Sequence, residues 1–430
     1  MAKKTESSIP NAARFVDLLV GKGGNYVFET AIADVVDNAI EAMASKIQIE
    51  IDFATNTVFL LDNGRGMSDV THREAMKFAS ETRSYTEKDL GKFGTGMKAA
   101  SLSQAERLTV ATRAKGSKDI FVRCLDRAHI RETNDWNSLT ILLEAEDLPK
   151  LAQEHLRKTH GTVVIWENLS ILSEARGVAP SEMANELLKA TKATDLHLSM
   201  IYHRFLSGET RDAHRVEITI NGNEVEPYDP FARDEKTWTL ETKNLTVNGE
   251  PVTLTGYVLP PEKEWSSTAS HKEHGRPKGW NASQGFYIYR NDRLIQWGTW
   301  LKIRKSEPHL SLARISLDFT SALDDVFGVT VDKSKVTLPE AVKERLDVPL
   351  QAIVKKANER YRSKASGLNA GILPGRQLAP ASSLKKKLTA SALVDLLERV
   401  STVHGKKVEL DTLKNLIREE SPSVAKEIGW

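Results

Sequence analysis

Cysteine, long apolar runs and an excess of one charge are all missing from this sequence of 430 residues. Its single cysteine, Cys124, excludes an internal disulfide and a cysteine-based metal cluster. We expect that residue to pack within a strand, in a reducing compartment. The start, MAKKTESSIPNAARF, lacks the apolar core of a signal peptide. A helix needs about 18 apolar residues to span a bilayer, and no apolar run in the sequence approaches that length. We therefore expect a cytoplasmic protein without a membrane partner.

The charges nearly cancel, with 60 Lys and Arg against 58 Asp and Glu, which excludes a protein that binds polyanions over its whole surface. An apolar content of 40% and a charged content of 27% are typical of a folded globular protein. The length predicts two or three domains. Composition leaves an enzyme and a scaffold equally open.

Apolar periodicity and turn residues divide the chain into four regions. Residues 1–175 predict a first α/β domain, and residues 176–364 predict a second α/β domain that ends in a long helix. Residues 365–384 are rich in Gly, Pro and Ser, which is typical of a linker. Residues 385–430 predict a small helical unit that is mildly basic.

Helices and strands alternate irregularly in the first region, which predicts an α/β sandwich of mixed strand order. Helices are expected over 11–44 with a Gly-rich interruption, from an N-cap at Ser68 to about Ser80, from Gly96 to about Gln104, near 181–205 and near 338–364. Strands are expected near 46–53, 57–61, 107–113, 119–125 and 161–167, and in several alternating runs over 213–335. The polar stretch 260–284 predicts a mobile loop.

Asp34 and Asn38 stand four residues apart in the helical sequence ADVVDNAIEA, so they lie on one helix face with Glu41 close by. An Asn carbonyl oxygen suits Mg²⁺, which takes the rest of its ligands from water and phosphates. A carboxylate one turn away can act as a general base on water. Taken alone, this face is also typical of a solvated helix.

Two glycine motifs follow this helix. In LLDNGRGM, Asp62 ends an apolar strand, where its carboxylate can accept a hydrogen bond from an adenine amino group, and Gly64 and Gly66 let a flat ring approach the backbone. The same residues also make a good β-turn. In GKFGTGMKAAS, glycines stand before a helix whose first N–H groups can bind phosphate, and Lys98 adds a positive charge. The motif is not a Walker A sequence, and no strand followed by GxGxxG supports a dinucleotide site.

The order and spacing of these motifs resemble the GHKL superfamily, whose members have the Bergerat ATP-binding fold. ADVVDNAIEA resembles the N box of that superfamily, DNGRGM its first glycine box, and GKFGTGMKAAS its second. HGTVVIWENL resembles the Gly-Thr strand that contacts the nucleotide. The resemblance covers roughly residues 25–340, is strongest in the first 170, and implies that the first domain binds ATP with Mg²⁺.

The resemblance implies a role for each matching residue. Asn38 would bind Mg²⁺, Asp62 would contact the adenine amino group, and Thr162 would support Asp62 by hydrogen bonding or through water. The platform for the ring would be Gly64, Gly66 and Met67. The phosphates would be bound by Gly91, Lys92, Phe93, Gly94, Thr95, Gly96, Met97 and Lys98.

Asp34 stands where the superfamily usually has a catalytic glutamate. Because its side chain is one methylene shorter, two alternatives stay open: an ATPase, and an ATP sensor that binds nucleotide with little turnover. A histidine kinase is disfavoured, because the first histidine, His72, lies within the ATP-binding region and not on a helix ahead of it.

The second region contains GFYIYRNDRLIQWG, over 285–298, which resembles the second domain of MORC-like proteins and of related stand-alone bacterial ATPases. The resemblance implies a transducer-like domain related to ribosomal protein S5. In these families a lysine of the second domain touches the terminal phosphate. GVTVDKSKV offers Lys333 and Lys335 for this catalytic role, and we favour Lys333, which stands three residues before Val336.

The resemblance implies a Mg²⁺-dependent ATPase that acts as an ATP-gated homodimeric clamp of the MORC or MutL type. A chaperone-like ATPase is a further alternative, and no nuclease-type metal motif supports MutL-like repair. DNA contacts would fall on residues 260–284 or on the basic unit at 385–430. The paired histidines, His155 with His160 and His271 with His274, do not have the spacing and third ligand of a metal site.

Overall fold

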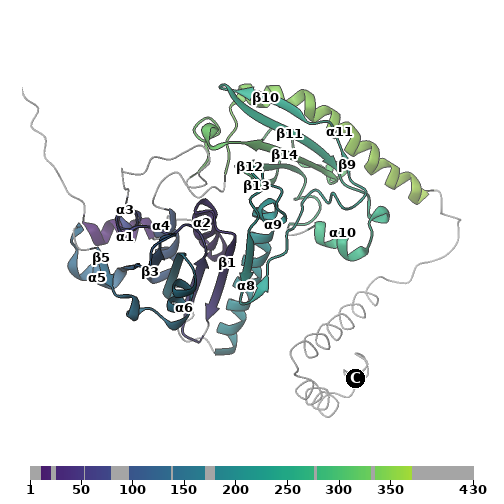
Figure 1. The fold of residues 1–430 in the computed structure, drawn as a ribbon. Helices are drawn as coiled ribbons and strands as arrows, with labels where there is room; N and C mark the ends of the chain where they lie inside the picture. The colour runs from purple at the N-terminus through teal and green to yellow at the C-terminus, as the bar shows by residue number, and fades with distance from the viewer. Residues whose placement is uncertain are drawn as a thin grey trace, which may run out of the picture. The chain divides into compact units, whose positions relative to one another are not determined.

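The computed structural model describes residues 11–20, 26–52, 54–78, 96–136, 139–169, 180–275, 278–330 and 335–369. The chain divides into two compact units, Met1–Ser366 and Gly367–Trp430. The first unit contains two β-sheets with their helices (Figure 1). The helical unit expected at 385–430 lies outside the described residues.

Eight strands form the first sheet, in the order β5-β4-β3-β6-β2-β1-β7-β8. They are β1 (Lys46–Asp52), β2 (Thr57–Asp62), β3 (Ala105–Arg113), β4 (Ile120–Asp126), β5 (Thr140–Leu143), β6 (Gly161–Leu169), β7 (Glu217–Ile220) and β8 (Asn223–Glu224). β1 pairs antiparallel with β2 and parallel with β7, so the sheet is mixed, as the irregular order of elements predicts. β2 lies between β6 and β1, and all six of its residues are buried.

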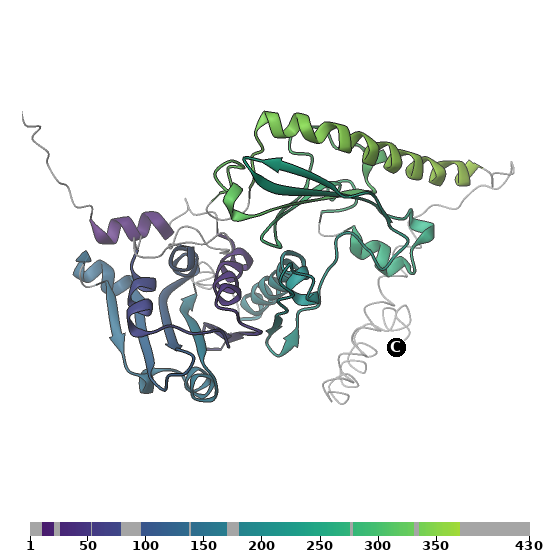
Figure 2. The ribbon, with the colours of Figure 1, turned by 45° about the horizontal axis from the view of Figure 1, so that its top comes forward.

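Helices cover both faces of this sheet. They are α1 (Ala12–Val20), α2 (Phe28–Glu41), α3 (Asp69–Met76), α4 (Gly96–Gln104), α5 (Arg127–Thr133), α6 (Lys150–Lys158), α8 (Pro180–Ile201) and α9 (His203–Ser207), with a 3₁₀ turn η2 (Ala145–Asp147). Val58 and Leu60 of β2 share a core with α2 and α4, whereas Phe59 and Leu61 point to the opposite core with α6. Figures 1 and 2 show α8 alongside α2, with which it is in contact.

The second sheet has the order β10-β11-β14-β12-β13, and β9 pairs with β11. Its strands are β9 (Trp238–Thr239), β10 (Lys243–Val247), β11 (Glu250–Val258), β12 (Gly285–Arg290), β13 (Arg293–Thr299) and β14 (Ala313–Phe319). Its helical elements are η3 (Glu262–Glu264), α10 (Thr268–His274), η4 (Pro308–Leu310), η5 (Ser321–Leu323) and α11 (Glu340–Asn369). α11 packs on this sheet, and a Cβ on Gly256 of β11 would lie only 2.5 Å from Ile353 Cγ1.

The structure confirms the predicted helices and strands around the three motifs, including the N-cap at Ser68, whose Oγ accepts a hydrogen bond from Thr71 N at 3.2 Å. The helix that follows Ser68 is shorter than expected, because it ends at Met76 and not near Ser80. Cys124 is buried in β4, as expected. The sequence patterns did not predict α5, β5 and α6. β7 and β8, which the sequence grouped with the second domain, extend the first sheet. α11 continues to Asn369, into the segment expected to be a linker.

The prediction of a loop over 260–284 is wrong for its central part, which forms α10. His271 of this helix stacks on Trp280, with ring centroids 4.6 Å apart, and His274 stacks on Tyr228 at 5.3 Å. Both histidines also contact the ring of Trp265, which is buried. These histidines are therefore part of an aromatic cluster of the second sheet.

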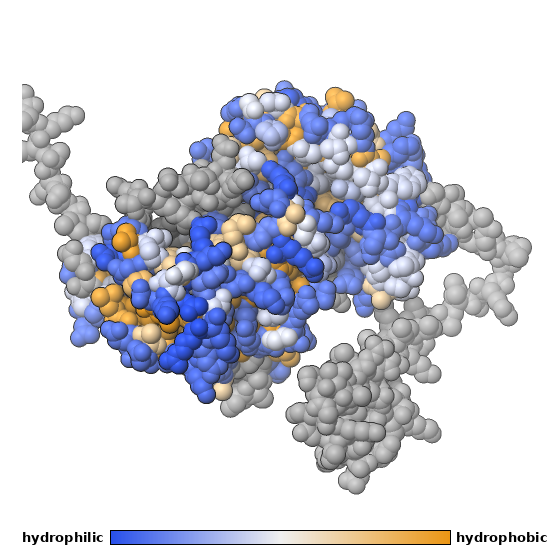
Figure 3. All heavy atoms as spheres, viewed as in Figure 1, coloured by the Kyte–Doolittle hydropathy of each residue, from blue (hydrophilic) through white to orange (hydrophobic). Residues whose placement is uncertain are grey.

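On the face drawn in Figure 3, polar residues predominate and apolar residues form separate patches. The exposed apolar side chains lie on different elements, such as Leu18 on α1, Leu142 on β5 and Val348 on α11. Among the helices that the structure describes, none combines the length and the apolar character needed to cross a membrane.

Candidate functional site

Helix α2 carries Asp34 and Asn38 at the predicted positions. Asp34 is 5% exposed, and its Oδ2 accepts a hydrogen bond from the Tyr26 hydroxyl at 2.8 Å. The Nδ2 of Asn38 donates to the main-chain oxygen of Asp34 at 2.8 Å. This bond fixes the amide so that its Oδ1, which accepts no hydrogen bond from any described residue, is left for another ligand. Asn38 thus fits the chemistry of a Mg²⁺ ligand.

Asp62 ends β2 and is 7% exposed. Its Oδ1 accepts hydrogen bonds from two main-chain groups, Gly64 N at 2.8 Å and Thr162 N at 3.2 Å. Burial raises the pKa of Asp62 to about 6, against the lowering effect of these two bonds and of His160. Its Oδ2 accepts no hydrogen bond within the described part of the chain, so one carboxylate oxygen is available to a ligand.

Two glycines of the site are required by the close approach of neighbouring backbone. Gly66 has a φ of +63°, and a Cβ there would lie 2.0 Å from the main-chain oxygen of Arg113. Gly161 has a φ of +140°, and a Cβ there would lie 1.9 Å from the main-chain oxygen of Asp62. Glycine at these positions therefore lets the DNGRGM segment lie directly against β3 and β6.

Thr112 of β3 links the same segments, although the sequence did not single it out. Its buried hydroxyl accepts a hydrogen bond from Met67 N at 2.9 Å and donates to the main-chain oxygen of Gly161 at 3.0 Å. It also lies 3.3 Å from the hydroxyl of Thr162. Thr162 donates its main-chain N–H to Asp62, whereas its side chain faces Thr112.

His155 and His160 contact the backbone around Asp62. His155 Nε2 lies 2.8 Å from the main-chain oxygen of Asp62, and His160 Nδ1 lies 2.6 Å from that of Gly64. Burial lowers the pKa of His155. The two histidines therefore hold the turn after β2, a role that their sequence spacing could not indicate because the contacts are more than ninety residues apart.

The start of α4 lies beside α2. A Cβ on Gly96 would be 3.3 Å from Asp34 Oδ2, so the first turn of α4 faces the carboxylate. Met97 is partly buried and packs against the first core. Lys98 is 2% exposed, and its Nζ donates to the main-chain oxygen of Ala75 at 2.7 Å. This contact holds α4 to the end of α3, and a phosphate contact of Lys98 stays a prediction.

Several predicted residues lie outside the described part of the chain. They are Gly91, Lys92, Phe93, Gly94 and Thr95 of the second glycine motif, and Lys333 of the second domain. Lys335 is described: it is exposed, and its N–H donates to Thr330 Oγ1 at 3.1 Å. Among the described residues, no cluster of three or more histidine, cysteine or acidic side chains is arranged to hold a metal ion.

The C-terminal end of α2 contacts the first glycine motif. The main-chain oxygen of Ala42 accepts a hydrogen bond from Arg65 N at 2.8 Å. A Cβ on Gly64 would lie 2.8 Å from Ala42 Cβ. Since Asp34 of the same helix faces Gly96, the three motifs meet on α2.

Comparison with known families agrees with this arrangement. Residues 26–162 match the family described as histidine kinase-, DNA gyrase B- and HSP90-like ATPase. This part of the chain is a GHKL ATPase domain, and it includes Asp34, Asn38, Asp62 and Thr162. The second sheet follows the matched region.

A DNA mismatch repair protein MutL from Parabacteroides distasonis is 31% identical to this chain over 94 residues. The aligned segment is 21% of this chain and 15% of the MutL protein, so the chain matches only a small part of that relative. The similarity to MutL is therefore distant and local.

Proposed function

We propose that the chain is a cytoplasmic, Mg²⁺-dependent ATPase that works as an ATP-gated homodimeric clamp of the MORC or MutL type. The observation that carries this proposal is the convergence of the three motifs on α2. Asp34 faces Gly96 at the start of α4, and Ala42 contacts the backbone at Gly64 and Arg65. One helix thus joins the candidate base, the adenine motif and the phosphate motif.

In this proposal, Asp62 accepts a hydrogen bond from the adenine amino group through Oδ2, above a platform of Gly64, Gly66 and Met67. The N–H groups between Gly91 and Lys98 bind the phosphates. Asn38 would hold Mg²⁺, which neutralises phosphate charge when bound. The free oxygen of Asp62 and the oriented amide of Asn38 support these two roles.

Asp34 is the proposed general base. It takes a proton from a water molecule whose oxygen forms a bond to the terminal phosphorus, while the bond from that phosphorus to the bridging oxygen of ADP breaks. The products are ADP and phosphate. Lys333, from a transducer-like second domain related to ribosomal protein S5, would contact the terminal phosphate and so couple ATP to closure of the dimer.

A second candidate is an ATP sensor with little turnover. It is supported by the hydrogen bond from Tyr26 to Asp34 Oδ2, because that bond occupies one oxygen of a side chain that is already short. The two candidates share the binding site and differ only in the rate of hydrolysis.

Turnover and oligomeric state together test the proposal. The ATPase candidate predicts phosphate release above buffer under saturating Mg²⁺-ATP, and a dimer by light scattering with a non-hydrolysable ATP analogue but not with ADP. Adding DNA to both assays tests for contacts through 260–284 or 385–430. A dimer without turnover would favour the sensor. No binding of ATP would overturn both candidates.

A further inference from the structure

Asp37 is a buried charge on the helix of the candidate ATP site, and it lies within the motif ADVVDNAIEA but has no assigned role in ATP binding. It is 1% exposed and stands between Asp34 and Asn38 on α2. A helix turns by about 100° per residue, so Asp37 points to a different side of α2 from Asn38. A buried carboxylate is costly unless other groups compensate its charge.

The partners of Asp37 come from outside the matched ATPase region. The Tyr202 hydroxyl, between α8 and α9, lies 2.6 Å from Asp37 Oδ1 and 2.7 Å from the main-chain oxygen of Ala33. Arg293 Nε, at the start of β13 in the second sheet, lies 2.7 Å from the same Asp37 oxygen. Its guanidinium lies 5.7 Å from the centre of the Tyr202 ring. The second sheet therefore contacts α2 through a buried ion pair.

Arg293 is held at a fixed place by the hairpin of β12 and β13. Asn291 and Asp292 form its turn, with φ values of 47° and 65°, and Arg290 pairs in register with Arg293. On the preceding strand, Arg290 forms two bonds to Asp324, at 2.6 and 2.7 Å.

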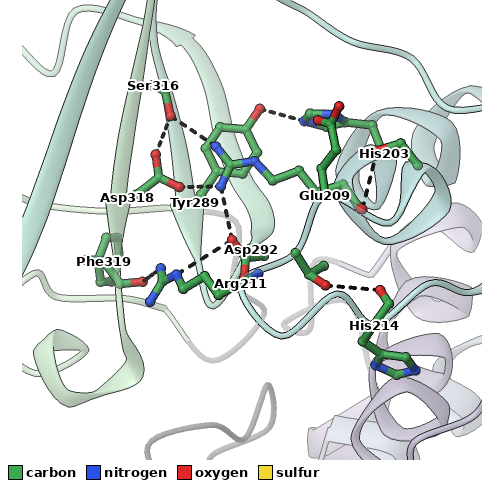
Figure 4. Close-up of polar contacts among 12 residues, drawn as sticks. His203, Glu209, Arg211, His214, Tyr289, Asp292, Ser316, Asp318 and Phe319 are labelled. Carbon is green, nitrogen blue, oxygen red and sulfur yellow. Dashed lines mark hydrogen bonds and ion pairs between the residues drawn. The ribbon is translucent and has the colours of Figure 1, made fainter. Parts of the chain in front are cut away.

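The turn of this hairpin is also tied to α9 and the segment after it. Asp292 lies 3.2 Å from Arg204 Nη1 and accepts a hydrogen bond from Arg211 N at 3.1 Å. Figure 4 shows Arg211 beside Asp292 and the ring of Tyr289 directed at His203, 2.8 Å between Tyr289 Oη and His203 Nε2. These contacts fix the position of the β12–β13 hairpin, and therefore the position of Arg293 next to α2.

The candidate base also contributes to keeping Arg293 charged. Burial alone would lower the pKa of the guanidinium, but Asp37, Tyr202 and Asp34 raise it, so Arg293 stays charged within the electrostatic range of Asp34.

We infer that Arg293 and Tyr202 are positioning residues, through which the second sheet and the junction of α8 with α9 fix α2 and thereby place Asp34 and Asn38 against the phosphates. The inference rests on the proposed ATP site. Asp62 itself lies on β2 and is held by the main chain of Gly64 and Thr162, so we expect its adenine contact to be much less sensitive to this ion pair than the positions of Asp34 and Asn38.

The test compares two neutral double variants. In Asp37→Leu with Arg293→Met, no charge is left buried without a partner, so the fold is preserved. We expect the turnover number to fall by about tenfold or more, because small displacements of reacting groups are costly. The gain in ATP affinity that Mg²⁺ provides should fall as well, while the affinity for ADP without Mg²⁺ stays within about twofold. Arg293→Lys should recover part of the turnover.

The matched control is Arg290→Met with Asp324→Leu, which removes a buried ion pair from the same hairpin without touching α2. Circular dichroism verifies that both double variants are folded, and we expect the control to keep turnover within about twofold. Wild-type turnover and wild-type Mg²⁺ dependence in the Asp37 and Arg293 variant would overturn the inference, as would equal losses in the two variants. If the wild type does not hydrolyse ATP, the test of the inference is the gain in ATP affinity that Mg²⁺ provides, compared between the wild type and the two double variants. Failure of the wild type to bind ADP or ATP would instead overturn the proposed function.

Discussion

The first and second sheets each have a buried aspartate near their ends, and the two charges are compensated differently. Asp324, beyond β14, receives two guanidinium bonds from Arg290. Asp62, at the end of β2, receives two main-chain hydrogen bonds on one oxygen, and burial raises its pKa to about 6. The two bonds from Arg290 occupy both carboxylate oxygens of Asp324, whereas one carboxylate oxygen of Asp62 stays available for a ligand. Incomplete compensation therefore distinguishes a binding site from a structural pair.

We expect the largest effect from a change at Asp34, because the difference between the two sheets depends on the first one carrying the catalytic site. Asp34→Asn should retain ATP but lose turnover by about a hundredfold or more, which is the usual contribution of a positioned base. Steady-state phosphate release and equilibrium ATP binding measure the two quantities. Asp34→Glu restores the usual length of the base and should match or exceed the wild-type rate. Full turnover by Asp34→Asn would remove Asp34 from the mechanism.

The proposed function gives the second domain a direct role in ATP hydrolysis only through Lys333. Lys333→Ala should bind ATP nearly normally and lose about tenfold or more of its turnover, together with the ATP-induced dimer, because the terminal phosphate no longer links the two domains. Lys335→Ala is the matched control and should change little. Light scattering and phosphate release check both variants. The reverse pattern would transfer the role to Lys335, and two silent variants would exclude the second domain from the mechanism.

The support of Asp62 by β6 can be tested through stability. Gly161→Ala places a Cβ against the main-chain oxygen of Asp62 and should lower the free energy of unfolding by about 3 kcal/mol. Gly116 also has a positive φ, of +85°, but a Cβ there meets nothing within 4 Å. Gly116→Ala should therefore cost only about 1 kcal/mol. Equal denaturation midpoints for the two variants would contradict the close approach of β6 to Asp62.

A pH titration tests whether Asp62 binds in its ionised form. Its usual pKa is 3.8 and its folded pKa is about 6, so the folded protein holds this proton until the pH rises through about 6. ATP affinity should then fall by about tenfold between pH 7 and pH 5. His72 affects the free energy of unfolding over the same pH range: burial lowers its pKa to about 3, so stability falls as the pH drops below about 6.5. Circular dichroism at each pH separates unfolding from weaker binding. Asp62→Asn should have a flatter profile, and an identical profile would contradict this role of Asp62.

Sequence patterns predicted those parts of the fold whose information is local. The 3.6-residue period of α2, the alternation in β1, the apolar run of β2 and the cap of α3 all lie within a few neighbouring residues. α5 and β5 are short, and their patterns are too brief to read. β7 could not be assigned to the first sheet because its pairing with β1 joins residues about 170 apart.

The candidate site depends on both local and distant residues. The residues proposed to touch ATP belong to motifs, so their types and spacing were sufficient to propose them, and their roles stay predictions. Residues that hold those motifs in place, such as Thr112, Tyr202 and Arg293, are distant in sequence from them, so no local pattern marks their role. The spacing to Val336 does not by itself decide between Lys333 and Lys335. Val336 is buried, but the two lysines are two residues apart, and residues two apart share a face in any extended chain.

Titration calorimetry of ATP and Mg²⁺-ATP tests the central claim most directly, since Asn38 and Asp62 are assigned to opposite ends of the nucleotide. Asn38→Ala should lose the gain in affinity that Mg²⁺ provides. Asp62→Asn should bind ATP about tenfold or more weakly with or without Mg²⁺, because it loses a charge-assisted hydrogen bond. Unchanged affinities in both variants, with the fold intact by circular dichroism, would show that ATP does not bind at this site.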